Sequence, residues 1–153
     1  MVFRIYSPDF SEGSTIPIKF TCDGSDIAPS LLWENPPANS ESYTLIVHDP
    51  DAPGGDWIHW VVYNIPASKR SLSETSSSEV TYPDGMHQGR NSWHQTKYGG
   101  PCPPSGTHRY FFTLYALDSI LDMEGGANYQ EVMAAMQSHI LAQATSMGTY
   151  SRK

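Results

Sequence analysis

Polar side chains that could bind an anion or transfer a proton occur at three places, each at the edge of an apolar run. Asp49 and Asp51 follow one such run, and His59 lies near the start of the next. His108 and Tyr110 open a third run, after a loop rich in glycine and proline. Carboxylates orient imidazoles, protonated imidazoles attract anions, and a tyrosine hydroxyl adds a donor. If the strands bring these places together, the residues form either an anion pocket or a general acid–base site.

Each of these residues also has a structural explanation, which the residues alone leave open. His59 can be a core histidine that hydrogen-bonds a carbonyl or a carboxylate. Asp49 and Asp51 can accept local backbone hydrogen bonds in Asx turns. Arg109 suits a bidentate ion pair with one of these aspartates, and Tyr110 can be an aromatic core residue.

A metal site is a competing hypothesis. His48, His59 and His108 with Asp49 contain the residue types of a 2-His-1-carboxylate centre for iron or zinc. No His-x-His pair would place two ligands on one strand face, however, and the sequence lacks Walker A, GxGxxG, GxSxG, HExxH and paired CxxC motifs. We therefore predict neither a metal nor a cofactor.

The elements that must position these residues are mainly strands. Period-two alternation and β-branched or aromatic runs predict strands over 3–5, 16–22, 43–47, 58–65 and 109–117, with 31–33 either a short strand or extended coil. The 58–65 run is apolar on both faces and is expected to be doubly buried. The stretch 99–118 combines a stiff loop with the longest expected strand, which we place centrally in the sheet.

The expected helix lies near the end of the sequence. It covers 128–147, begins near Asn128 and has Gly148 just after its last turn. Its buried stripe consists of residues four apart, namely Val132, Met136, Ile140 and Ala144. The Ser-rich segment 69–79 is expected to be a surface loop, and 80–98 to be mostly irregular.

Composition limits the class of protein. A chain of 153 residues with 39% hydrophobic and 16% charged residues predicts one globular domain over 1–153, and 12 Gly and 12 Pro favour β structure. The net charge of −7 argues against non-specific binding to nucleic acids or anionic membranes. No 18-residue apolar run and no secretory signal pattern occur, so we expect a cytoplasmic protein. In that compartment Cys22 and Cys102 are expected to be buried free thiols.

Several motifs, taken together and in order, resemble one known family. The segments are TCDGSDIAPSLLW at 21–33, DPDAP at 49–53, WIHW at 57–60, WVVYNIPA at 60–67, GGPCPPSGTHRY at 99–110 and GTYSR at 148–152. They are similar to the phosphatidylethanolamine-binding protein family, also called the Raf kinase inhibitor protein family. The short length is closer to the bacterial and archaeal members. Animal members carry a second histidine where this chain has Ile58, which weakens any inference about lipid binding or kinase control.

The resemblance implies a mainly β fold, a β-sandwich of two antiparallel sheets with a few peripheral helices, one of them near the C-terminus. It also implies a small anion pocket at one end. The implied ligand-binding residues are Asp49, His59, Pro104, His108 and Tyr110. The implied pocket-shaping residues are Pro53, Gly100, Pro101, Asp51 and Arg109. Arg109 is expected to pair with Asp51, the proline corners can contain cis peptide bonds, and His59 or His108 is expected to be cationic near neutral pH.

The function that follows is a non-enzymatic binding protein for phosphate or phosphoryl ligands, such as a phospholipid head group, a phosphometabolite or a phosphorylated side chain, with a role in kinase signalling. The alternatives are an inhibitor of serine proteases or carboxypeptidases, and a hydrolase with Cys102 as the candidate nucleophile. A protein kinase or a protease is the candidate protein partner. A homodimer is a further expectation, for which aromatic residues could supply the interface or, more simply, the core: Trp57, Trp60, Trp93 and Tyr98.

Overall fold

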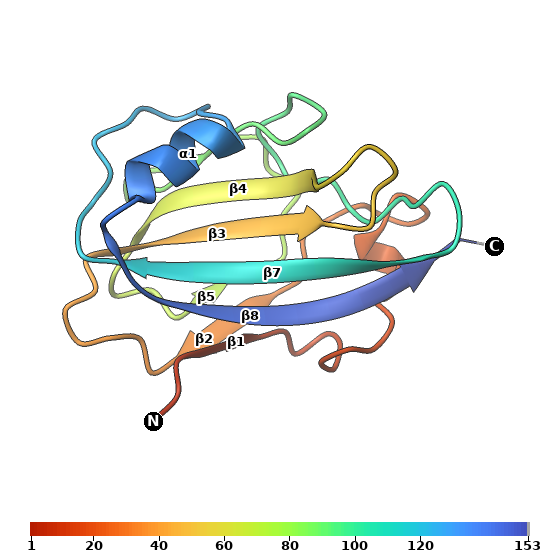
Figure 1. The fold of residues 1–153 in the computed structure, drawn as a ribbon, viewed down its shortest axis with the longest axis horizontal. Coiled ribbons are helices and arrows are strands. Elements are labelled where there is room, and N and C mark those ends of the chain that lie inside the picture. The colour runs from red at the N-terminus through yellow and green to blue at the C-terminus, as the bar shows by residue number, and fades with distance from the viewer. Residues whose placement is uncertain (153) are drawn as a thin grey trace.

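The structure is a computed structural model that describes residues 1–152. Two antiparallel sheets form its framework (Figure 1). The small sheet has the order β1-β2-β5, with β1 at Arg4–Tyr6, β2 at Leu31–Glu34 and β5 at Ser71–Leu72. The large sheet has the order β6-β4-β3-β7-β8, with β6 at His87–Gln88, β4 at Trp57–Pro66, β3 at Ser42–Asp49, β7 at Thr107–Leu117 and β8 at Ile140–Ser151. A 3₁₀ helix η1 covers Ile18–Phe20 and an α-helix α1 covers Tyr129–Met136.

The large sheet is covered on one face and partly covered on the other, where β8 keeps exposed side chains. One face packs on the small sheet through a core that includes Trp33, Tyr43 and Phe112. The other face packs under α1, which contributes Val132 and Met136 (Figure 1). The double burial predicted for 58–65 is therefore confirmed, and it explains why β4 has no polar face. The expected β-sandwich is confirmed as well.

The helix is real but much shorter than predicted. Asn128 caps α1 in a capping box with Glu131, as its position near the predicted start suggests. The helix ends at Met136, because Ser138 adopts a left-handed φ of 74° that turns the chain into β8. Beyond this point the predicted helical stripe is wrong, since the following residues pair with β7 from Ile140 onward. Tertiary pairing with a long apolar strand thus outweighs a helical period that continues by coincidence.

The other predicted strands differ mainly in their bounds. The strand expected over 16–22 is wrong, because η1 occupies its middle and the segment joins β8 only through Thr15 and Ile16, beside Thr149. The 31–33, 43–47, 58–65 and 109–117 predictions are confirmed as β2, β3, β4 and β7. β7 lies between β3 and β8, as expected for a central strand.

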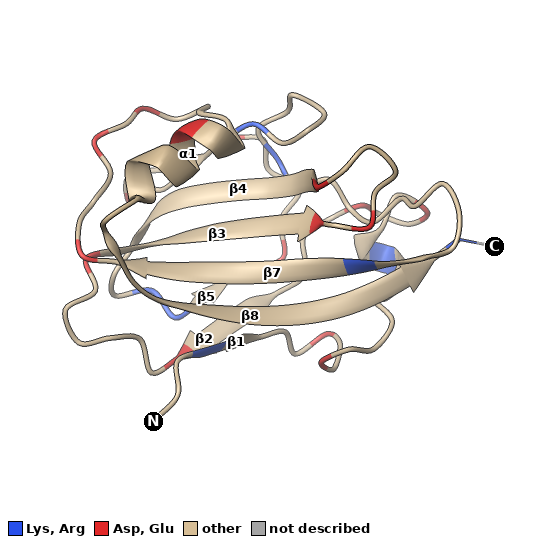
Figure 2. Cartoon of the chain, in the orientation of Figure 1, with Lys and Arg blue, Asp and Glu red and all other residues tan. Residues whose placement is uncertain are grey.

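Charged residues lie mostly in loops and at strand ends, and the long strands are largely free of charge in their middles (Figure 2). Several charged groups therefore meet where β3 ends, β4 begins and β7 begins. In residues 1–152, no helix combines the length and hydropathy needed to cross a bilayer.

Candidate functional site

A cavity of about 770 Å³ opens where these three strand ends meet. Its floor comes from the large sheet and carries Asp49, His59, His108 and Tyr110. One wall is the loop at 102–104, another is the segment 52–58, and the rest comes from 90–94 and from the start of α1. The strand ends therefore bring together four of the five residues expected to bind ligand, and Pro104 of the loop lines the same cavity.

Asp49 and His108 form a buried pair across adjacent strands. The Nδ1 atom of His108 lies 2.6 Å from Oδ2 of Asp49, and the two residues are 6% and 3% exposed. The other carboxylate oxygen, Oδ1, accepts a hydrogen bond from the backbone N–H of Asp51 at 2.8 Å. Asp49 therefore both closes an Asx turn and orients an imidazole, so the two alternatives for this residue hold together. With Nδ1 donating to the carboxylate, Nε2 of His108 is left for another partner.

Arg109 turns away from the cavity and braces the turn after β3. Its Nε and Nη2 atoms donate to the two carboxylate oxygens of Asp51, at 2.9 and 2.8 Å, and its backbone N–H donates to Oδ2 at 2.9 Å. The guanidinium lowers the pKa of Asp51 to about 2. The pairing expected from the resemblance is confirmed, and neither residue lines the cavity.

His59 owes its position to a β-bulge. In the β3–β4 ladder Val47 faces Trp60 and His48 faces Ile58, so His59 is the extra residue. The bulge reverses the alternation: Trp60 enters the core between the sheets, whereas Ile58 packs on the side of α1. A regular strand would place these two residues on the same face.

The loop at Gly99 satisfies the polar groups of this bulge. Gly99 N–H donates to the carbonyl of His59 at 3.0 Å, and Nδ1 of His59 donates to the carbonyl of Gly99 at 2.7 Å. A carbonyl can only accept, so Nδ1 carries the proton and the neutral ring keeps Nε2 as an acceptor. The approach requires glycine, because a Cβ at Gly99 would lie 2.3 Å from the ring of Trp93.

The expectation that His59 could be cationic near neutral pH is corrected by this geometry. Burial lowers the pKa of His59 from 6.5 to about 4, against the opposing effect of the Gly99 carbonyl. Both structural alternatives for His59 apply: it is a core histidine bonded to a carbonyl, and it lines the cavity. At neutral pH its contribution to ligand binding would be as a hydrogen-bond acceptor.

Tyr110 places a hydroxyl against the cavity. The residue is 1% exposed, and its buried hydroxyl makes no hydrogen bond of normal geometry within residues 1–152, although the Asp49 carboxylate and the Cys102 backbone lie near it. Burial, followed by the nearby Asp49 charge, raises the pKa of Tyr110, so its proton stays in place. Two other buried side-chain atoms in the described chain lack partners, at Trp33 and Thr44, and neither lines the cavity. A buried donor without a partner is costly, which makes this hydroxyl a candidate ligand contact.

The other predicted pocket-shaping residues form the wall or its support. Pro53 lines the cavity directly, whereas Gly100 and Pro101 lie behind it. Gly100 N–H donates to Oδ1 of Asp26 at 2.7 Å, and the Pro101 carbonyl accepts from Cys22 N–H at 3.1 Å. All peptide bonds of the described chain are trans, so the expected cis bonds are absent there.

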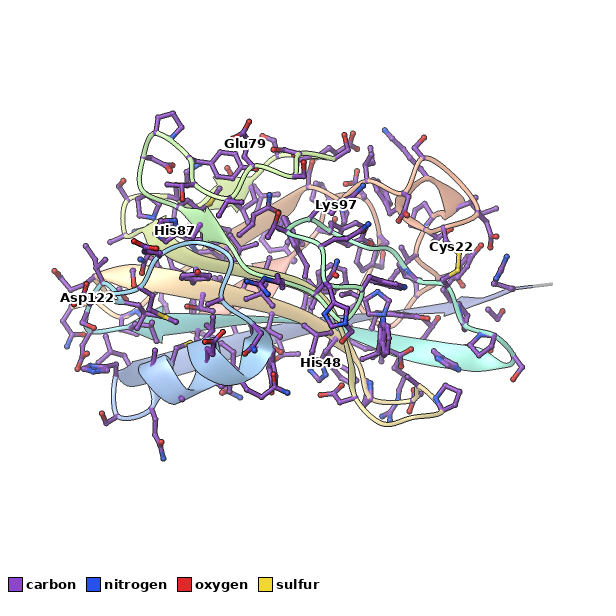
Figure 3. All side chains as sticks on the ribbon, turned by 90° about the horizontal axis from the view of Figure 1, so that it is seen from above. Cys22, His48, Glu79, His87, Lys97 and Asp122 are labelled. Carbon is purple, nitrogen blue, oxygen red and sulfur yellow. A yellow bond between two sulfur atoms is a disulfide. The ribbon has the colours of Figure 1, made fainter. Side chains whose placement is uncertain are left out.

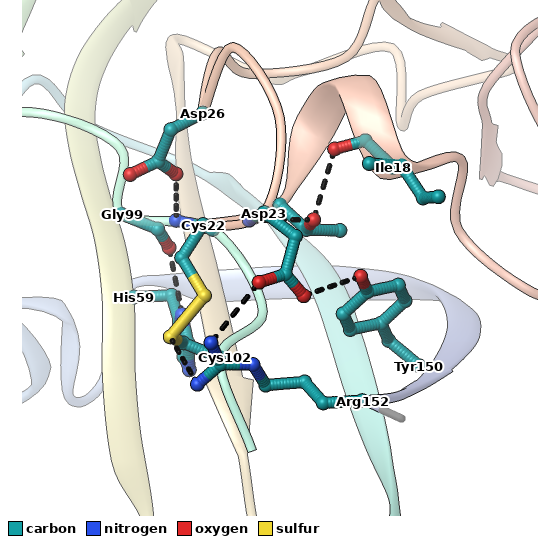
Figure 4. The surroundings of a disulfide bond; sticks show 11 residues. Ile18, Cys22, Asp23, Asp26, His59, Gly99, Cys102, Tyr150 and Arg152 are labelled. Atoms are coloured by element: carbon teal, nitrogen blue, oxygen red, sulfur yellow. Dashed lines mark hydrogen bonds and ion pairs between the residues drawn. A yellow bond between two sulfur atoms is a disulfide. The ribbon is translucent and has the colours of Figure 1, made fainter. Parts of the chain in front are cut away.

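The two cysteines are joined in a disulfide, which corrects the expectation of free thiols (Figure 4). Cys22 and Cys102 are 80 residues apart in the sequence, so no local spacing revealed the pairing. The bond fastens the cavity wall at Cys102 to the loop after η1. It also removes the thiol considered as a nucleophile. Because disulfides persist mainly in oxidising compartments, the cysteines no longer agree with the expected cytoplasmic location, which stays a prediction.

The loop that carries Cys22 is itself tied to the end of β8 (Figure 4). The carboxylate of Asp23 accepts from the Tyr150 hydroxyl at 2.6 Å and pairs with Arg152 at 3.1 Å. The cavity wall thus depends on segments near both ends of the described chain.

Sequence reasoning missed a second part of the cavity. Arg90, Trp57, Trp93 and Tyr129 all line it, and Trp57 and Trp93 are 37% and 40% exposed. Arg90 and Trp93 lie in an irregular segment without a periodic signal. Tyr129 is the first residue of α1, where the helical pattern did not indicate a site, and Trp57 was considered only for an interface or the core. Trp60 and Tyr98, the other two aromatics of that set, are buried in the core.

The metal hypothesis gains no support from the arrangement. Within residues 1–152, no cluster of three or more His, Cys, Asp or Glu side chains is placed to bind one ion. His48 pairs instead with Asp56, at 2.7 Å between Nδ1 and Oδ1.

The comparisons with known proteins agree with the fold and the order of the motifs. A sequence profile described as phosphatidylethanolamine-binding protein matches residues 6–151. The chain therefore belongs to the phosphatidylethanolamine-binding protein family.

Relatives and solved structures extend this assignment. A UPF0098 protein of Methanothermobacter thermautotrophicus is 47% identical over 143 residues, covering 94% of this chain and 95% of the relative. A UPF0098 protein of Aquifex aeolicus is 44% identical over 99% of this chain and 90% of the relative. The crystal structure of a phosphatidylethanolamine-binding protein homolog from Chlamydia trachomatis superposes with a TM-score of 0.90 at 38% identity, covering 99% of this chain and 98% of the other. YbcL of E. coli, described as a member of the mammalian PEBP family, gives a TM-score of 0.91 at 31% identity and covers 99% of both chains.

Proposed function

We propose that this protein is a non-enzymatic binding protein whose cavity takes a phosphate or phosphoryl group. The observation that carries the proposal is the buried His108–Asp49 pair beside the unpartnered hydroxyl of Tyr110. With its Nδ1–H donated to the carboxylate, His108 can donate to an anion from Nε2 when that nitrogen also carries a proton. The Tyr110 hydroxyl supplies a second donor, and both groups line one cavity.

His59 completes the set with the opposite polarity. Its Nδ1–H is used by Gly99, so its neutral Nε2 can accept the proton of a monoprotonated phosphate or of a neighbouring hydroxyl. Two donors and one acceptor suit a phosphoryl group that keeps a P–OH, or a phosphate ester with a hydroxyl or ammonium donor beside it. A phospholipid head group, a phosphometabolite and a phosphorylated side chain all present this chemistry.

The absence of enzymatic activity is part of the proposal. The Cys102 sulfur is in a disulfide, and the Ser92 hydroxyl oxygen accepts from Ile58 N–H at 2.8 Å. Neither is paired with a base in the manner of an activated nucleophile. Kinase modulation, protease inhibition and a homodimer stay predictions.

The test is calorimetric binding of inorganic phosphate, phosphoethanolamine and sulfate to the wild type and to His108→Ala. Loss of a charge-assisted hydrogen bond is expected to weaken binding by roughly tenfold to a hundredfold. The matched control is His139→Ala, which removes an exposed histidine that pairs with Asp118 at 2.8 Å and lies off the cavity. Unchanged phosphate binding in His108→Ala would contradict the proposal.

Sulfate also provides a pH test, because it stays a dianion throughout the neutral range. Any change in its affinity with pH therefore reports groups on the protein. If the anion is held by the Nε2–H of a doubly protonated His108, sulfate binding weakens at the higher pH, because the ring then has no Nε2 proton to donate. A sulfate affinity that rises with pH would exclude an imidazolium as the recognising group.

A further inference from the structure

The cavity is much larger than a phosphate ion, and its remaining wall is aromatic. The rings form a continuous series: the centroids of His108 and Tyr110 lie 6.5 Å apart, those of Tyr110 and His59 5.2 Å, those of His59 and Trp93 5.0 Å, and those of Trp93 and Trp57 5.5 Å. The last two rings are more than a third exposed. An apolar surface therefore leads from the anion end of the cavity toward its opening.

Arg90 also lines this cavity, and its charge has no partner. Within residues 1–152, the other Lys and Arg side chains except Lys97 make an ion pair or a hydrogen bond: Arg4, Lys19, Lys69, Arg70, Arg109 and Arg152. An unpaired arginine is unusual in a protein whose net charge is −7, because acidic side chains outnumber basic ones. The Lys97 side chain (Figure 3) also has no partner within the described residues, but it does not line the cavity.

The acidic groups of the cavity are already occupied. Its two carboxylates, Asp49 and Asp56, are bonded to His108 and His48 at 2.6 and 2.7 Å. They are therefore not available to neutralise Arg90. The guanidinium is the remaining full charge that a ligand could meet there.

The backbone holds Arg90 in place while its side chain stays free. Its N–H donates to the Ala127 carbonyl at 2.9 Å, and it bridges to Asn128 at the start of α1. The next residue, Asn91, fixes the following turn by accepting from Trp93 N–H and donating to the Lys97 carbonyl, at 2.9 and 2.8 Å. The backbone of Arg90 is thus fixed relative to Trp93, while its guanidinium can still adjust to a ligand.

We propose that the cavity binds a two-ended ligand, a phosphorylated carboxylic acid whose phosphoryl group lies at His108 and Tyr110, whose apolar middle lies on Trp93 and Trp57, and whose carboxylate pairs with Arg90. The inference rests on the proposed function for its phosphoryl end and adds the class of molecule that carries it. A planar guanidinium with free donors binds a carboxylate in bidentate fashion, which a lysine would not.

The test is a homologous series of ω-phosphonocarboxylates of increasing chain length, each compared with the alkylphosphonate of equal length. At the length that spans the cavity, the carboxylate is expected to strengthen binding by about tenfold, the size of one charge-assisted contact. In Arg90→Gln this gain disappears, while the alkylphosphonate binds as in the wild type. Arg90 is exposed, so the variant is expected to fold, and retained alkylphosphonate binding verifies it.

Lys97→Gln is the matched control. The Lys97 side chain is also unpaired within the described chain but lies outside the cavity, so its loss should not change the affinity that the carboxylate adds. If alkylphosphonates bind and the carboxylate adds nothing at any length, the two-ended ligand is wrong and the phosphoryl site stands. An equal gain in Arg90→Gln overturns it as well. If no phosphonate binds at all, the proposed function fails and the inference fails with it.

Discussion

His59 and His108 lie in the same cavity and are almost equally buried, yet they are held by opposite kinds of structure. His108, on β7, hydrogen-bonds the carboxylate of Asp49 on the paired strand β3. His59 leans on the Gly99 carbonyl, in a loop fastened by a disulfide. A carboxylate can balance a charged ring, whereas a carbonyl offers only a dipole against the cost of burial. The comparison teaches that the partner, and not the depth of burial, decides what a buried histidine can do.

The largest expected effect on stability comes from removing the disulfide, which fastens the loop that bonds His59 but not the strand that bonds His108. Replacing both cysteines by serine removes a cross-link between residues 80 apart, which the chain-entropy relation values at about 4 kcal/mol of unfolding free energy. Chemical denaturation of the double variant measures this loss. Gly99 belongs to the loop that the disulfide fastens, whereas Asp49 lies on β3. Loss of the disulfide should therefore shift the NMR signals of the His59 ring and leave those of His108 unchanged. An equal response of both rings would remove the contrast between them.

The next effect is acid destabilisation through His59. Its folded-state pKa of about 4 lies below the ordinary value of 6.5, so the folded protein resists protonation that the unfolded chain accepts. This stabilisation is complete above pH 6.5 and is lost as the pH falls toward 4, by roughly 3 kcal/mol.

The measurement is unfolding free energy against pH in the wild type and in His59→Gln, which keeps a donor for Gly99 but cannot titrate. The difference between the two curves isolates His59 from the carboxylates. A difference that does not change between pH 6.5 and 4 would mean that the ring is not held neutral.

The smallest expected effect concerns the Asp51–Arg109 ion pair, which braces the turn after β3 next to the His108–Asp49 pair. Asp51→Asn breaks the ion pair with Arg109, whose side chain is 52% exposed, and should lower the unfolding free energy only slightly because solvent screens the pair. Phosphate affinity should not change, because Asp49 and not Asp51 orients the imidazole. A large loss of affinity would show that the brace and the ligand contact are not separate.

The sheet side of the site could be predicted from the sequence. Asp49, His108 and Tyr110 sit at the ends of long apolar runs, and the family motifs place them in one pocket. Arginine geometry predicted an ion pair between Arg109 and one of the two aspartates, and the family resemblance selected Asp51. These predictions succeed because a strand's alternation fixes where its polar ends point.

The loop side could not be predicted in the same way. The bulge at His59 depends on a register between two strands, and the helix ends at Met136 because β8 pairs with β7. Arg90 lies in a segment without a periodic pattern. It becomes a candidate site residue only once the structure shows that the carboxylates of the cavity already have other partners. All of these depend on contacts between segments distant in sequence, which one chain read in order does not reveal.

The hydrogen bond from the Tyr150 hydroxyl to Asp23 joins residues that are 127 apart in the sequence, which affects the order in which the chain folds. β8 is synthesised after every other element that the structure describes, and until it pairs with β7 the loop at Asp23 has neither this hydroxyl nor Arg152 to hold it. These contacts cannot form until β8 has been synthesised and has paired with β7. Because such long loops close slowly, we expect the cavity wall to be ordered late in folding.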